Sequence, residues 1–174
     1  MAWKNNRTDF GAISRILHWG MAALILWQLT LGWMIANIAP GLANLWLFGL
    51  HKTIGMVALV LVLGRIAWHR YNPPPGDFGV TRRKTIAKAA HIALYICMIT
   101  LPLTGWVASS ATGLDVVIFG YIPLPAIAPV SPKWEEVGFI LHTTTGKVMM
   151  LILLLHILGA VTQRDGLLAR MIWG

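Results

Sequence analysis

Four long apolar segments constrain this chain more than any other feature of its sequence. They run from about residue 13 to 38, 46 to 69, 87 to 111 and 137 to 162. A helix needs about 20 apolar residues to cross the ~30 Å hydrocarbon layer of a bilayer, and each segment is long enough. Only 11% of the 174 residues are charged, whereas soluble domains carry about 25%. We therefore expect an all-α, integral membrane four-helix bundle that forms one domain, residues 1–174.

The positive charges are distributed unevenly around these segments. Eleven lysines and arginines lie near the chain ends and the connection between the second and third segments, and three lie toward the opposite side. The positive-inside rule then predicts that both termini and this connection are cytoplasmic, in a bacterial inner membrane. Because bilayer edges explain the net charge of +8, no nucleic-acid partner is expected. The first apolar run is too long for a cleaved signal peptide, so we expect it to be retained.

Four histidines lie at matching depths in the predicted bundle. His51 and His142 open the second and fourth segments on the outer side. His18 and His156 lie at the cytoplasmic ends of the first and fourth segments. His142 and His156 share one helix face, about 21 Å apart along the axis. Ionisable groups inside a membrane are costly and usually functional, and two imidazoles fill both axial positions of a haem iron. The pattern predicts two bis-histidine haem b groups, since hydrogen bonding to neighbouring helices or a histidine proton relay needs no paired depths.

Five further residues have expected roles near these histidines. Gly55 and Gly146 each follow a ligand candidate by four residues, so each either clears the helix face for a flat porphyrin or packs against another helix. Arg65 returns to the haem-facing side at the cytoplasmic level, where it pairs with a haem propionate or reaches the lipid headgroups. His91 is a competing ligand, or a contact for a propionate or quinone. The lone Cys97 excludes an intramolecular disulfide and a covalently attached c-type haem.

Several stretches of the chain match a known family pattern when they are taken together. They are Arg15-Ile16-Leu17-His18-Trp19, His51-Lys52-Thr53-Ile54-Gly55, Arg65-Ile66-Ala67-Trp68-His69-Arg70, Asn72-Pro73-Pro74-Pro75, His91 to Tyr95, Leu101-Pro102-Leu103-Thr104-Gly105, His142 with Gly146, and His156. In these stretches the chain resembles the bacterial cytochrome b561 family, dihaem membrane cytochromes grouped with the b-type subunits of nickel–iron hydrogenases. The resemblance implies two b haems ligated by the four matching histidines, and electron exchange with the quinone pool. Some members carry histidines just after the last ligand, near a proposed quinone site, whereas this chain has Gln163-Arg164-Asp165.

The first functional hypothesis is a quinone-linked oxidoreductase. Members similar to this chain oxidise superoxide and reduce ubiquinone. Superoxide would then donate its electron near His51 and His142, attracted by Lys52 and Lys147, which are otherwise ordinary interfacial lysines. Ubiquinone would be reduced near the cytoplasmic side, and the candidate contacts there are His91, Arg65, Gln163 and Arg164.

The second hypothesis is a non-catalytic haem-bearing membrane anchor. In this case a partner dehydrogenase or hydrogenase docks on the outer loop, with Trp134, Glu135 and Glu136 as part of the docking surface. A dehydrogenase that co-purifies with the chain favours this hypothesis, and a lone subunit that reduces quinone with superoxide favours the first.

Overall fold

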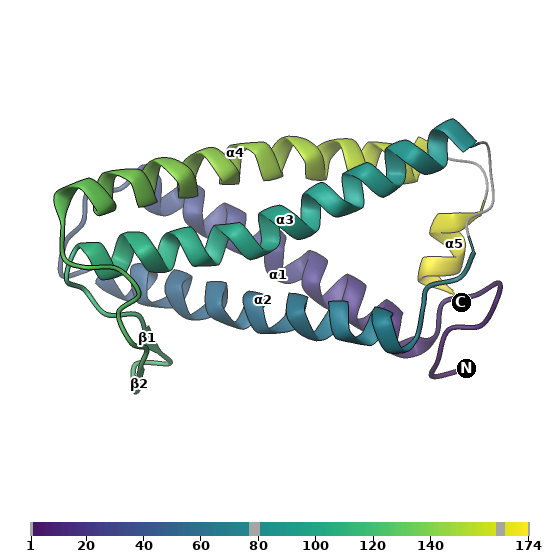
Figure 1. Cartoon of the computed structure of the whole chain (residues 1–174), viewed down its shortest axis with the longest axis horizontal. Helices are drawn as coiled ribbons and strands as arrows, with labels where there is room; N and C mark the ends of the chain where they lie inside the picture. The colour runs from purple at the N-terminus through teal and green to yellow at the C-terminus, as the bar shows by residue number, and fades with distance from the viewer. Residues whose placement is uncertain (1, 77–80, 163–165, 174) are drawn as a thin grey trace.

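The computed structural model describes residues 2–76, 81–162 and 166–173. Four long helices run side by side along its longest axis (Figure 1): α1 Ala12–Ala36, α2 Leu45–Tyr71, α3 Thr81–Ala111 and α4 Pro132–Thr162. Each contains a stretch long and apolar enough to cross a membrane, so the chain is a multi-pass membrane protein. A short helix, α5 Leu167–Ile172, and two strands, β1 Val117–Ile118 and β2 Ile122–Pro123, complete it.

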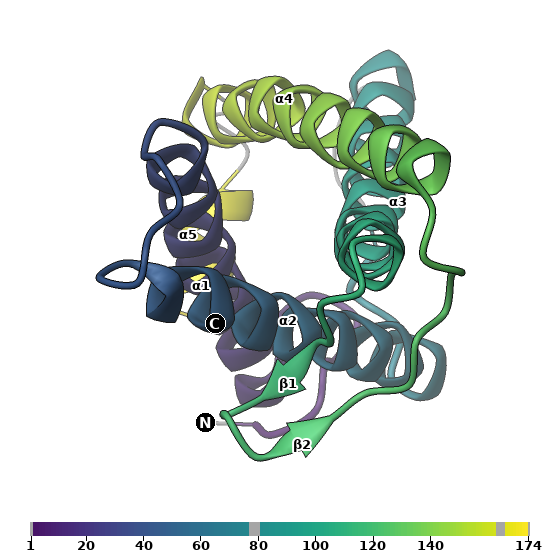
Figure 2. The ribbon, with the colours of Figure 1, turned by 90° about the vertical axis from the view of Figure 1, so that its left-hand side faces the viewer.

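The four helices follow one another in chain order around the bundle (Figure 2). Close backbone contacts join α1 to α2, α2 to α3 and, most extensively, α3 to α4, whereas α1 and α4 scarcely touch. Gly138 of α4 allows the close packing of α3 against α4, because a Cβ atom there would lie 2.9 Å from the Cα of Ala108. The two helices that carry His18 and His156 are therefore neighbours around the bundle without being packed backbone to backbone.

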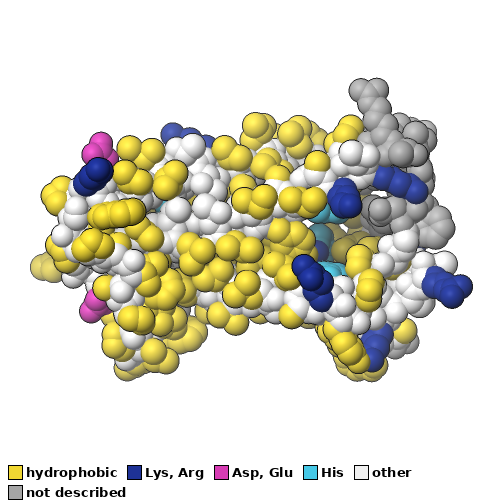
Figure 3. Space-filling model, in the orientation of Figure 1, with side chains coloured by type: hydrophobic (Ala, Val, Ile, Leu, Met, Phe, Trp, Pro, Cys, Tyr) yellow, Lys and Arg dark blue, Asp and Glu magenta, His cyan; other side chains and the backbone are white. Residues whose placement is uncertain are grey.

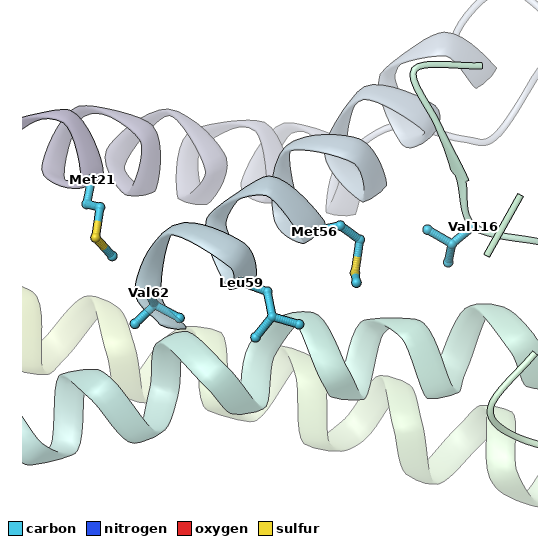
Figure 4. Packing of buried hydrophobic residues seen from close by; sticks show 5 residues of the cluster. All are labelled: Met21, Met56, Leu59, Val62 and Val116. Carbon is cyan, nitrogen blue, oxygen red and sulfur yellow. The ribbon is translucent and has the colours of Figure 1, made fainter. Parts of the chain in front are cut away.

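A small apolar cluster lies between α1, α2 and the loop that joins α3 to α4 (Figure 4). Met56, Leu59 and Val62 recur at three-residue spacing on α2, so they share a face. They pack with Met21 of α1 and with Val116, and Val62 is fully buried. Large apolar side chains on the opposite helix faces remain exposed, as expected where lipid is the solvent.

The loop between α3 and α4 forms a hairpin that the sequence did not predict. Its prolines indicated an irregular segment, but β1 pairs antiparallel with β2, and the Tyr121 N–H donates to the Ile118 carbonyl at 3.1 Å. Phe119 (φ 53°) and Gly120 (φ 77°) both have positive φ, as a type I′ turn requires. The prediction of an irregular segment is therefore wrong for this part of the loop, while the chain as a whole is mostly helical.

The two ends of the bundle differ in charge. The N-terminal segment and α5 lie at one end (Figure 1), where the Trp19 indole donates to the Met171 carbonyl at 3.0 Å. Asn5 donates to the Asn72 and Pro73 carbonyls and so fastens the N-terminal segment to the end of α2. Lys and Arg side chains gather at this end, and the visible Asp and Glu side chains lie at the other (Figure 3). We call the end with the termini the terminal end, and the end with the hairpin the hairpin end.

Candidate functional site

His51 and His142 face each other near the hairpin end. Their ring centroids are 5.9 Å apart, and the ring planes are nearly perpendicular, at 84°. The Nδ1–H of His142 donates to the Leu101 carbonyl of α3 at 2.8 Å, because a carbonyl can only accept. The Nε2 atom of His142 then keeps its lone pair for a metal. The Nδ1 atom of His51 is buried and has no hydrogen-bond partner among the described residues.

Glycines contact both of these rings, but they come from other helices than the sequence predicted. A Cβ atom on Gly32 of α1 would lie 3.2 Å from Cε1 of His51, and one on Gly105 of α3 would lie 3.0 Å from Nδ1 of His142. Both spacings are tighter than an ordinary contact. Sequence reasoning gave neither glycine a role beside a histidine, although Gly105 stands in a stretch that matches the family pattern, because it considered only glycines on the helix that carries each histidine.

Gly55 and Gly146, which the sequence placed beside the haems, each lie next to a side chain of another helix. A Cβ atom on Gly55 would lie 3.2 Å from the Gln28 amide nitrogen, and one on Gly146 would lie 3.8 Å from Leu101. Gln28 uses that amide to donate to the His51 carbonyl at 2.6 Å. Gly55 thus makes room for a hydrogen bond that joins α1 to the turn of α2 that carries His51.

Three histidines meet nearer the terminal end. The ring centroids of His18 and His156 are 6.3 Å apart, and the planes are inclined by 57°. His91 of α3 lies closer still to His156, with centroids 5.1 Å apart. The structure therefore brings the predicted pair together and places the competing candidate beside it.

Arg65 lies beside His18, at the level that its spacing from His51 predicted. Its Nη2 atom is 3.0 Å from Nδ1 of His18, and its Nε–H donates to Nε2 of His69 at 3.5 Å. The guanidinium also lies over the Tyr95 ring, 5.7 Å from the centroid. Among the described residues no carboxylate lies within ion-pair distance of it, so Arg65 is a partly buried cation available to an anionic group.

The remaining predicted residues are less closely tied to the histidines. Lys52 donates to the Asp115 carbonyl at 3.3 Å, at the base of the hairpin. Lys147 is exposed on α4. Gln163 and Arg164 lie outside the described residues.

The paired imidazoles fit a haem iron better than a bare metal ion. Metal–imidazole bonds are roughly 2 Å long, so rings on opposite sides of a metal have centroids about 6 Å apart. The two pairs, at 5.9 and 6.3 Å, agree with that spacing. Within the described part of the chain no three His, Cys, Asp or Glu side chains converge as a metal site. Structural zinc needs about four protein ligands, whereas a porphyrin leaves only the axial positions to the protein.

Fold and site together define a multi-pass membrane protein with half-buried histidine pairs at two levels. A family model of prokaryotic cytochrome b561 matches residues 9–174. Cytochrome b561 homolog 2 of Escherichia coli (strain K12) is 32% identical over 139 residues, which cover 72% of this chain and 69% of that protein. The chain therefore belongs to the prokaryotic cytochrome b561 family, whose members are membrane b-type cytochromes of electron transfer. Members of the family bind b-type haem.

Proposed function

We propose that this chain is a dihaem cytochrome that passes electrons between a one-electron donor on the outer side and ubiquinone in the inner membrane. The observation that carries the proposal is the pair of histidine sites at two levels of one bundle, with ring centroids 5.9 and 6.3 Å apart. Both termini would be cytoplasmic, because positive side chains gather at the terminal end (Figure 3). The hairpin end would then face the outer side.

In this proposal His51 and His142 hold the outer haem, and His18 and His156 hold the inner one. A bound haem with two imidazole ligands supplies reversible one-electron chemistry and has no open position for oxygen. The Leu101 carbonyl fixes the tautomer and orientation of the His142 ring through the Nδ1–H hydrogen bond. Gly32 and Gly105 let both rings approach the neighbouring helices closely.

Arg65 has a different role at the inner level. Arginine only donates hydrogen bonds, so its contact with Nδ1 of His18 assigns the ring proton to Nε2. If His18 held a haem iron through Nε2, it would have to give up this contact, and the Arg65 guanidinium would then be free for a charge-assisted hydrogen bond with a haem propionate.

The inner cluster also supplies groups that suit quinone chemistry. Two superoxide ions deliver two electrons, and one quinone takes up these electrons and two protons to give quinol and two molecules of oxygen. The imidazole of His91 can donate or accept a hydrogen bond at a quinone oxygen, and Arg65 donates hydrogen bonds to a reduced quinone oxygen. Lys52 at the hairpin end, with Lys147, would attract the superoxide anion. Gln163 and Arg164 are proposed as further quinone contacts.

A reduced optical spectrum of the purified protein tests the haem content directly. We expect a bis-histidine b-type spectrum and two haems per chain. The activity is tested with the lone subunit in detergent, a superoxide source and a short-chain ubiquinone. We expect quinol formation that superoxide dismutase suppresses. A colourless protein, or one with a single haem, contradicts the proposal.

A second function is favoured by the hairpin. Phe119 and Tyr121 are 66% and 87% exposed, and the Phe119 N–H donates to Thr53, two residues after His51. An exposed apolar surface of this kind suits a docked protein. In this alternative a partner dehydrogenase or hydrogenase delivers the electrons and the chain is its membrane anchor. A partner that co-purifies with the intact chain, but not with a Phe119→Ser and Tyr121→Ser variant, supports it, whereas full activity of the lone subunit with superoxide contradicts it.

A further inference from the structure

A polar cavity at the terminal end is not part of either histidine site. Its volume is about 220 Å³, and its lining includes Lys4, Asp9, Arg15 and Trp173. The N-terminal segment forms one wall, because the Ala12 N–H donates to the Ala2 carbonyl at 2.9 Å and folds the segment back over the start of α1. The end of α5 forms another wall. The cavity therefore lies where both ends of the chain meet the first turn of a membrane helix.

Arg15 is a buried cation in the lining of this cavity. Its side chain is only 7% exposed, although it carries a full charge. Its Nη1–H donates to the Ile172 carbonyl at 3.1 Å, and its buried Nε–H has no acceptor among the described residues. The described residues place no carboxylate within ion-pair distance of it either. A buried cation with donors to spare is costly unless an anion accepts from it. A negatively charged ligand group next to Arg15 would therefore offset the cost of burying its charge.

Asp9 adds a negative charge to the same cavity. Its Oδ2 atom accepts from the Thr8 hydroxyl at 2.7 Å and from the Asn6 amide at 3.3 Å. These hydrogen bonds, that of Thr8 first, hold the pKa of Asp9 below its usual range, so the carboxylate is ionised at neutral pH. Lys4 is the second cation of the lining, and Arg170 reaches the same segment through the Thr8 carbonyl. The cavity thus offers cations together with one carboxylate.

The position of the cavity indicates where such a ligand comes from. Arg15 stands in the first turn of a helix long and apolar enough to span the membrane, where the lipid headgroups are expected. Trp3 and Trp173 flank it and are 70% and 78% exposed. Exposed tryptophans at helix ends are typical of the membrane interface, where the ring lies among headgroups. The ligand is therefore expected to arrive from the bilayer.

We propose that this cavity binds the headgroup of a membrane phospholipid, with the phosphate at Arg15 and the ammonium of an ethanolamine headgroup at Asp9. A bound headgroup ties the N-terminal segment to α5, because both walls contact it. The site stabilises the terminal end of the bundle and is independent of electron transfer.

The experiment uses the haem-loaded, detergent-purified full chain after delipidation. The probes are dioleoyl phosphatidylethanolamine, dioleoyl phosphatidylglycerol and free phosphorylethanolamine. Bound lipid is counted by native mass spectrometry, and thermal unfolding is followed by tryptophan fluorescence. We expect the ethanolamine lipid to bind and raise the unfolding temperature. Arg15→Gln should weaken its binding about tenfold or more, because a charge-assisted contact is lost.

Asp9→Asn keeps the proposal testable even if Arg15→Gln does not fold. It should bind both lipids and lose the preference for the ethanolamine headgroup. Lys133→Gln, at the opposite end, is the control and should bind like the native chain. Equal lipid binding by native chain, Arg15→Gln and Asp9→Asn overturns the proposal. Equal binding of free phosphorylethanolamine and lipid also overturns it, because the site would then take a soluble anion. If Arg15→Gln loses lipid binding but keeps both haems, the lipid site is independent of the haem sites.

Discussion

The histidine pairs that we propose to hold the outer and inner haems are built differently. At the outer level the groups that contact the two rings are neutral, since His142 bonds to the Leu101 carbonyl, and Gly32 and Gly105 lie against the rings. At the inner level three imidazoles lie with the Arg65 guanidinium and the Tyr95 ring. The outer surroundings fix the geometry of two ligands. The inner surroundings supply a cation and further hydrogen-bonding groups, which agrees with the proposed division into an electron entry point and a quinone site.

The largest expected effect is loss of the outer haem. His142→Ala or His51→Ala removes one of two axial ligands, and no other histidine among the described residues has its ring next to this pair. We expect the haem-to-protein ratio to fall from two to one, measured by the pyridine haemochrome spectrum. His69→Ala is the control and should keep both haems. Two haems in both outer variants would refute the pairing.

The inner site provides the sharper test, because it has a spare imidazole. His18→Ala should remove the inner haem, whereas His91→Ala should leave two haems and a bis-histidine spectrum. Electron paramagnetic resonance of the oxidised protein separates the two haems by their g-values. If His91→Ala lost the inner haem and His18→Ala kept it, His91 rather than His18 would be the inner ligand.

The sequence predicted features that depend on one helix at a time. The helices follow directly from apolar length, and the meeting of His18 with His156 follows from matched depth in antiparallel spans. Arg65 reached the inner level because fourteen residues make nearly four turns. Depth alone did not separate His91 from His18, since both lie toward the terminal end. Whether His18 or His91 comes closer to His156 depends on the order of the helices around the bundle and on the rotation of each helix about its axis.

Contacts between helices were not predictable from spacing within one helix. Gly105 lies against His142 because α3 and α4 pack closely, and the packing places residues far apart in sequence side by side. The hairpin was missed for a local reason. Phe119 has a positive φ, which a bulky residue rarely adopts, and only Gly120 signals the turn. The Phe119 N–H donates to the Thr53 hydroxyl at 3.2 Å, a tertiary contact that helps hold this conformation.

Arg65→Gln should have the next largest effect, confined to the inner site. A nearby cation destabilises the oxidised, more positive iron, so its removal should lower the inner midpoint potential. We expect a fall of about 60 mV or more, since that value corresponds to a tenfold change in a one-electron equilibrium. Redox titration with optical detection measures it. Arg65→Lys keeps the charge and is the control, and an equal shift of both haems would contradict a local role.

A smaller effect on the outer site comes from a single methyl group. In Gly105→Ala the new Cβ atom would lie 3.0 Å from the His142 ring, whereas in Gly146→Ala it would lie 3.8 Å from Leu101. The first must displace the ligand ring and should cost about 1–3 kcal/mol, as overpacking does. We expect partial loss of the outer haem in Gly105→Ala only, measured by haem content and unfolding temperature. Equal behaviour of the two variants would show that the ring tolerates the contact.

Gln28→Leu should have the smallest effect, because two contributions oppose each other. The substitution removes the hydrogen bond to the His51 carbonyl, worth about 0.5–1.5 kcal/mol. It also removes the buried Oε1 atom, which has no partner among the described residues and carries a desolvation cost. We expect a fall of the unfolding temperature of about 2–4 °C or less, with both haems retained. Thr30→Val, which removes a hydroxyl bonded only to its own helix, is the matched control. If Gln28→Leu lowered the unfolding temperature more than Gly105→Ala does, Gln28 would support His51 by more than its hydrogen bond to the His51 carbonyl.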